Sequence, residues 1–175
     1  MKKWKWKQIL LHGILLVLLI FLDQFTKHLA GANLTGGRDL VIWDHVFRLT
    51  YVENFGAAFG TMENSRVFLL VTTSILMIYI LFLYVRLAAR NGYRILRSCC
   101  IAILAGGIGN MIDRVRLGYV IDFLYFELID FPVFNVADCY ITCAVAVLMI
   151  SMIFIYKESD MDLLIPFGKD KTNES

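Results

Sequence analysis

The segment Val67–Val85, "VFLLVTTSILMIYILFLYV", contains no charged residue and is long enough to cross a bilayer as one helix. A backbone in lipid must satisfy its own hydrogen bonds, so this run predicts a transmembrane helix. The rest of the chain has the same character, because 59% of its 175 residues are hydrophobic and its mean hydropathy is +0.67. Soluble domains average about 45–50% apolar residues. The composition therefore predicts an all-α membrane protein.

Three further apolar windows approach the roughly 20 residues that span a bilayer. They cover approximately residues 8–29, 95–112 and 139–156, and polar residues or glycines interrupt the first two of them. The length of the chain allows one domain. We therefore expect four transmembrane helices in a single membrane-embedded domain, residues 1–157, followed by a solvated C-terminal tail, residues 158–175.

Basic residues gather in two of the segments that flank these windows. The segment before the first span and the connection between the second and third spans carry basic residues and no acid, whereas the other two connections contain more acids than arginines. By the positive-inside rule, both termini are predicted to be cytoplasmic and the two acidic loops to face outward. The net charge of +2 is too small to indicate nucleic-acid binding. The basic residues that set this orientation are Lys2, Lys3, Lys5, Lys7, Arg86, Arg90, Arg94 and Arg97.

The first outer loop contains segments with strand character. "DLVIWD" (39–44) and "HVFRLTYVEN" (45–54) are rich in branched and aromatic residues with partial alternation, which predicts a small sheet over the outer face. "NFGAAFG" (54–60) follows, and its glycines indicate a tight turn or a segment that dips to the membrane. Asn64 or Ser65 then offers a cap for the second span.

Asp23 and Lys27 are the first charges at membrane depth. They lie four residues apart, so they share one face of the first helix, and that face is expected to point into the bundle. A structural ion pair that fixes the helix to its neighbours is the simplest interpretation. The basic start and the small residues "AGA" (30–32) also resemble a cleavable signal peptide. Because these two charges intervene and three more spans follow, we expect a retained anchor.

The segment "GGIGNMIDRV" (106–115) closes the third span. Its glycines permit close helix approach, as small residues do in membranes. Asn110, Asp113 and Arg114 follow at the outer boundary. Asp113 is a catalytic candidate, but the adjacent arginine favours a permanently ionised, structural carboxylate. Arg114 is suited equally to a substrate carbonyl or to a lipid headgroup.

Two further aspartates lie in "VIDFLYFELIDFPVFNVADCYI" (120–141). Asp122 and Asp138 are sixteen residues apart, in the second outer loop and at the outer start of the fourth span. Taken singly, Asp122 is explained as an interfacial residue that points to water. Asp138 is explained as a first-turn acid, three residues after a plausible N-cap at Asn135. Neither explanation requires catalysis.

As a pair, the two acids permit a reaction that neither permits alone. Carboxylates that share a site do not both ionise easily, so one keeps a proton while the other acts as a base. Such a pair can activate water and protonate a carbonyl, which fits an aspartyl protease at the outer membrane surface. The histidines offer no convincing partner for a serine or cysteine nucleophile. Cys139 and Cys143 share a helical face but lack further ligands at metal spacing, so we expect no metal.

Five motifs, in this order on four spans, closely resemble the lipoprotein signal peptidases (type II signal peptidases) of bacteria. They are "DQFTK" (23–27), "ENFGAAFG" (53–60), "GGIGNMIDR" (106–114), "VIDF" (120–123) and "FNVADCYI" (134–141). The resemblance implies an aspartyl protease of the cytoplasmic membrane. It also implies cleavage of the signal peptide from a prolipoprotein just before its diacylglyceryl-modified cysteine. We expect no cofactor, and a monomer that acts among membrane lipids.

The resemblance also implies roles for single residues. Asp122 and Asp138 correspond to the catalytic dyad. The glycines of the second motif, Gly56 and Gly60, are expected to let that loop approach or cover the substrate. The remaining motif residues are expected to hold the dyad, the substrate backbone or the lipid headgroup; they are Asp23, Lys27, Asn54, Asn110, Asp113, Arg114 and Asn135.

Two other classes of function remain open from the residues alone. A proton or ion carrier would also place acids and a lysine inside a bundle, although it would be expected to have acids along a continuous path and Val67–Val85 has none. A structural protein would need no paired acids. Ion flux in proteoliposomes discriminates the first class, and peptide cleavage discriminates both.

Overall fold

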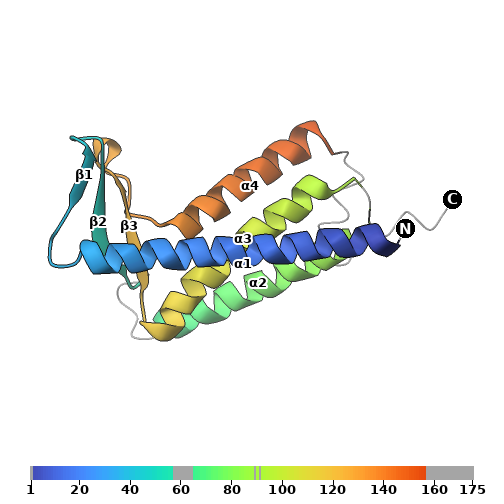
Figure 1. Cartoon of the computed structure of the whole chain (residues 1–175), viewed down its shortest axis with the longest axis horizontal. Helices are drawn as coiled ribbons and strands as arrows, with labels where there is room; N and C mark the ends of the chain where they lie inside the picture. The colour runs from blue at the N-terminus through green and yellow to red at the C-terminus, as the bar shows by residue number, and fades with distance from the viewer. Residues whose placement is uncertain (1, 57–64, 89, 91, 157–175) are drawn as a thin grey trace.

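The computed structural model describes residues 2–56, 65–88, 90 and 92–156 (Figure 1). Within these residues, four helices are long and apolar enough to cross a membrane, which confirms the four helices predicted from the sequence. Gly60 and Asn64 lie outside the described residues. The elements in chain order are α1 (Lys2–Asn33), β1 (Leu40–Trp43), β2 (Phe47–Asn54), α2 (Ser65–Ala88), α3 (Arg94–Arg116), β3 (Val120–Phe126), the 3-10 turn η2 (Glu127–Ile129) and α4 (Val136–Phe154).

Helix α3 forms the centre of the bundle and contacts the other three helices. Of its apolar window, 67% is buried inside the molecule, against 6% for α1 and 17% for each of α2 and α4. The outer three helices therefore expose apolar side chains to the surroundings, as lipid-facing helices do.

The glycines of α3 allow this packing, as the sequence predicted. An added Cβ at Gly106 would lie 2.5 Å from the backbone oxygen of Ala137 on α4. At Gly107 it would fall on the Met77 side chain of α2, and at Gly109 on a side chain of α1. Each glycine therefore faces a different neighbour, and the three approaches require the absence of a side chain.

A three-stranded antiparallel sheet, in the order β1-β2-β3, lies at one end of the bundle. The start of α1, the connection from α2 to α3 and the end of α4 lie at the opposite end (Figure 1). β1 and β2 come from the loop predicted to form strands. The third strand was not predicted. It comes from the connection between α3 and α4, and Asp122 on it pairs with Val52 of β2.

The chain after β3 returns to the same strand before α4 begins. Phe134 forms a bridge to Leu124, with Phe134 N donating to Leu124 O at 3.0 Å and Leu124 N donating to Phe134 O at 2.8 Å. Residue 135, the next along the chain, is thereby held beside β3. At the other edge of this region, Ala30 of α1 and Leu34, the residue after α1, pack against Phe123. The sheet is thus fixed to the end of α1 and to the start of α4.

Candidate active site

Asp122 and Asp138 come together through one residue, Asn135, which uses its side chain for the first carboxylate and its backbone N–H for the second. Asn135 Nδ2 donates to Asp122 Oδ1 at 2.6 Å, and Asn135 N donates to Asp138 Oδ2 at 3.1 Å. Asp138 N in turn donates to Asn135 Oδ1 at 3.1 Å, so residues 135 and 138 form the reciprocal capping box at the start of α4. The N-cap that the sequence predicted is confirmed, and the same cap joins the two carboxylates.

Two more amides hold the remaining oxygens of this pair. Asn54 Nδ2, at the end of β2, donates to Asp122 Oδ2 at 2.7 Å. Asn110 Nδ2, on α3, donates to Asp138 Oδ1 at 2.9 Å. Each carboxylate therefore has a bonded partner on both oxygens, and the partners come from separate elements. This arrangement fixes the orientation of both groups.

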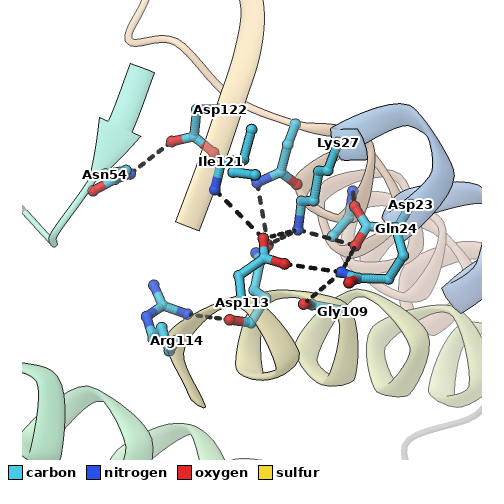
Figure 2. Close-up of polar contacts among 12 residues, drawn as sticks. Asp23, Gln24, Lys27, Asn54, Gly109, Asp113, Arg114, Ile121 and Asp122 are labelled. Atoms are coloured by element: carbon cyan, nitrogen blue, oxygen red, sulfur yellow. Dashed lines mark hydrogen bonds and ion pairs between the residues drawn. The ribbon is translucent and has the colours of Figure 1, made fainter. Parts of the chain in front are cut away.

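The Lys27 ammonium lies at the centre of a buried polar cluster beside this pair (Figure 2). Nζ lies 2.9 Å from Asp23 Oδ2, 2.8 Å from Asp113 Oδ2 and 2.7 Å from Asn110 Oδ1. A lysine has three N–H donors, and these three contacts use all of them. The ammonium therefore orients Asn110, which holds Asp138, and has no donor left for another group.

Asp23 connects the same cluster to α4. Its Oδ1 accepts from Ala137 N at 3.1 Å, across 114 positions of sequence. The first N–H groups of a helix have no partner inside the helix, so an anion is favoured there. Asp23 on α1 and the side chain of Asn135 thus both stabilise the first turn that carries Asp138. The predicted i,i+4 ion pair of Asp23 and Lys27 is confirmed, and both side chains face inward.

Asp113 ties α3 to α1 and to β3. Its Oδ1 accepts from Gln24 Nε2 at 3.0 Å, and its Oδ2 lies 3.4 Å from Ile121 N, next to Asp122 in the chain. The adjacent Arg114 was the reason to expect a structural Asp113 from the sequence, whereas the cation in direct contact with Asp113 is Lys27. Successive helical side chains point about 100° apart, so chain neighbours do not face each other. Arg114 Nη1 instead makes a long contact of 3.5 Å to Asn110 O (Figure 2).

Gln24 is a residue that the sequence analysis did not single out. Its Nε2 contacts Asp23, the backbone oxygen of Gly109 and Asp113 at 3.2, 3.1 and 3.0 Å (Figure 2). It therefore joins α1 to α3 at the level of the cluster. The sequence could have indicated Gln24 through its position inside the motif "DQFTK", next to Asp23.

Burial sets the electrostatics of Asp122, which is 2% exposed. Burial raises the pKa of its carboxyl from the ordinary 3.8 to about 6, against the hydrogen bonds from Asn54 and Asn135, which lower it. The negative charge of Asp138 raises the pKa further. Asp138 itself is partly exposed. One carboxyl of the pair is thus enclosed with a raised pKa, and the other is partly exposed.

Gly56 follows the second motif strand in a conformation that favours glycine. Its φ is +84°, and Gly56 N donates to Asn54 Oδ1 at 2.8 Å. An added Cβ would fall on the Leu69 side chain. Gly56 thereby terminates β2 and orients the amide that holds Asp122.

Comparison with known proteins gives a consistent result. The family model for signal peptidase (SPase) II matches residues 15–154. The lipoprotein signal peptidase of Caldanaerobacter subterraneus is 43% identical over 142 residues, which is 81% of this chain and 94% of that protein. The lipoprotein signal peptidase of Clostridioides difficile is 36% identical over 150 residues, or 86% of this chain and 99% of that protein.

A solved structure resembles the fold as well. A bacterial membrane enzyme determined by the in meso method superposes with a TM-score of 0.73 at 27% identity. The match covers 83% of this chain and 94% of that one. With a family model that matches most of its length and relatives well above 30% identity, the chain belongs to the lipoprotein signal peptidase (signal peptidase II) family.

Proposed function

We propose that Asp122 and Asp138 are the catalytic dyad of this chain. As a member of its family, the chain is a membrane aspartic peptidase that removes signal peptides from prolipoproteins. The observation that supports this choice of residues is the bridge through Asn135, which contacts both carboxylates at 2.6 and 3.1 Å. Asp23 and Asp113 are excluded as the reacting pair because both are committed to the Lys27 ammonium.

The proposed chemistry divides the work between the two acids. One carboxylate takes a proton from a water molecule, and the other gives a proton to the scissile carbonyl or to the leaving amine. The enclosed Asp122 is suited to hold the proton and the more open Asp138 to face the water. The asparagines that bond to both carboxylates keep them in place during this exchange.

The other motif residues are proposed as positioning groups. Lys27 has no donor left for a substrate, so it acts through Asn110 on Asp138. Arg114 differs, since the hydrogen bond described for its guanidinium is long, at 3.5 Å. We assign it to a substrate carbonyl beside the dyad, because guanidinium donors match planar acceptors.

The bond cut and the sidedness are also part of the proposal. The scissile bond is the one just before the diacylglyceryl-modified cysteine, and the dyad acts at the extracytoplasmic surface of a monomer. Three features support the sidedness: the sheet and the dyad lie at one end of the bundle, the basic flanks belong to the other end, and the start of α1 and the end of α4 lie at that other end (Figure 1). Residues 1–157 are proposed to form the single peptidase domain.

The deciding experiment is cleavage of a diacylglyceryl-modified prolipoprotein by the purified protein in detergent. Asp122→Asn and Asp138→Asn should each abolish cleavage, and a chelator should not affect the parent. Asp130→Asn is the matched control, because Asp130 is an exposed acid on the same outer segment. Cleavage that survives both dyad substitutions would refute the assignment.

Sidedness has a separate test. A membrane-impermeant maleimide applied to intact cells should label Asp44→Cys, at the sheet end, and should label Arg94→Cys only after the membrane is opened. The parent, labelled in parallel, gives the background of the native cysteines. The reverse pattern would contradict the proposed orientation.

A further inference from the structure

An apolar groove opens beside Asp138, between the start of α4 and the segment that leads to it from β3. The groove has a volume of about 560 Å³. One wall is α4, through Asp138, Cys139, Thr142 and Cys143. We call the whole groove the α4 groove. The opposite wall consists of Phe126, Ile129, Phe131, Pro132, Val133 and Phe134.

The lining of the α4 groove suits a hydrocarbon and not a peptide. Among the lining residues, Asp138 is the charged one and Thr142 the other with a side-chain oxygen; the rest present hydrocarbon, aromatic rings or sulfur. An extended peptide segment would bring N–H and C=O groups that need hydrogen-bond partners, and burying them without partners is unfavourable. A hydrocarbon chain needs no such partners.

The size and position of the groove point to one hydrocarbon in particular. An apolar cavity of roughly 150 Å³ holds benzene, so about 560 Å³ is oversized for one amino-acid side chain and accommodates a long acyl segment. The groove begins at a dyad residue and continues to Cys143, more than one helical turn into the apolar helix. A ligand that starts at the scissile bond and continues as hydrocarbon matches this course.

We propose that the α4 groove binds one acyl chain of the diacylglyceryl group on the substrate cysteine. This rests on the proposed function, since it requires a substrate whose lipidated cysteine adjoins the scissile bond. Lipid tails are as apolar as the groove lining, so transfer of the chain from bilayer to groove gains little affinity. The expected benefit is to the reaction geometry, because a chain held in the groove sets the distance from the scissile carbonyl to Asp138.

Misplacement of a reacting group by about 1 Å can cost on the order of 10²-fold in rate. The test therefore measures kcat/KM for one peptide carrying either a dipalmitoylglyceryl or a dibutanoylglyceryl cysteine. Thr142→Trp places an indole in the groove. Met149→Trp is the matched control, because Met149 lies on the same face of α4, seven residues further along and outside the groove, and is 55% exposed.

Thr142→Trp should lower the long-chain to short-chain ratio of kcat/KM by at least about tenfold. Met149→Trp should keep the ratio of the parent. An unchanged ratio in Thr142→Trp overturns the acyl-chain proposal, and the proposed function survives if the parent still cleaves and the dyad variants do not. A parent that cleaves neither lipopeptide overturns both.

A second measurement does not depend on the folding of the groove variant. The Asp122→Asn protein holds an uncleaved substrate that bears a photoreactive diazirine at the end of one acyl chain, and the adducts are located by mass spectrometry. Adducts on residues 126–134 and 139–143 are expected. Adducts confined to α1 or α2 overturn the proposal. A photoreactive phospholipid that labels the groove and is not displaced by substrate also overturns it, because the occupant is then bulk lipid.

Discussion

Gly109→Ala should disrupt the polar cluster that positions the dyad, although it adds only one methyl group. The new Cβ would fall on the Asp23 carboxylate and lie 3.0 Å from its Cγ. That carboxylate is fully buried and is fixed by Lys27 Nζ at 2.9 Å and Ala137 N at 3.1 Å. It cannot move aside without losing these contacts.

The structure sets the size of the effect. A hydrogen bond to a charged group contributes about 1.5–3 kcal/mol, and overpacking a filled site costs about 1–3 kcal/mol. Displacing Asp23 should therefore lower the free energy of unfolding by about 3–5 kcal/mol. The free energy of unfolding of a native protein is about 5–15 kcal/mol in total, so the variant should be severely destabilised.

Gly13→Ala is the matched control on α1. An added Cβ at Gly13 meets no atom within 4 Å, and replacing a helical glycine by alanine should stabilise by roughly 0.5–1 kcal/mol. Both variants are purified in the same detergent, and their unfolding and their cleavage of a lipidated substrate are compared with the parent. Equal unfolding free energies for the two variants would refute the reasoning, because Asp23 would then have room to move.

The remaining predictions concern pH and the loop after β2. As the pH rises from about 4 to above 6, the unfolding free energy of the parent should fall by about 3 kcal/mol relative to that of Asp122→Asn. The reason is that the folded pKa of about 6 exceeds the ordinary 3.8, so the unfolded state loses this proton first and folding is penalised once the carboxyl ionises. A difference that is flat with pH would contradict the raised pKa. Gly56→Val should slow cleavage, since its side chain would strain a φ of +84° and fall on Leu69. Gly37→Val has a similar φ of +76° with open space around it, so it controls for backbone strain; equal turnover in both would remove the role given to Gly56.

The sequence predicted those features whose physical cause is local. Four helices follow from four apolar runs, because lipid allows few other backbone conformations. The capping box follows from residues three apart, and the Asp23–Lys27 pair from residues four apart. The catalytic role of Asp122 and Asp138 stays a prediction, although the structure brings both carboxylates to one residue, Asn135.

The features that the sequence missed depend on contacts between distant segments. The strand β3 is paired through β2, and its own pattern, "VIDFLYF", became a strand only beside that partner. The sequence offered Arg114 as the nearby cation for Asp113, whereas the ammonium in contact with Asp113, that of Lys27, comes from another helix. Gln24 joins two helices at a depth that no spacing rule indicates.

The saturated ammonium of Lys27 has a consequence for biogenesis. α1 precedes α3 along the chain, so Lys27 and Asp23 enter the membrane before Asp113 and Asn110 follow, with each other and Gln24 of the same helix as partners. The later helix completes the coordination, and α4 then receives its first-turn partner from Asp23. The contacts that join Asp122 to Asp138 are therefore complete only when α4 is in place, because Asn135 and Asp138 lie at its start. A chain inserted only through α3 lacks Asp138, so the proposed pair of carboxylates is incomplete until α4 follows.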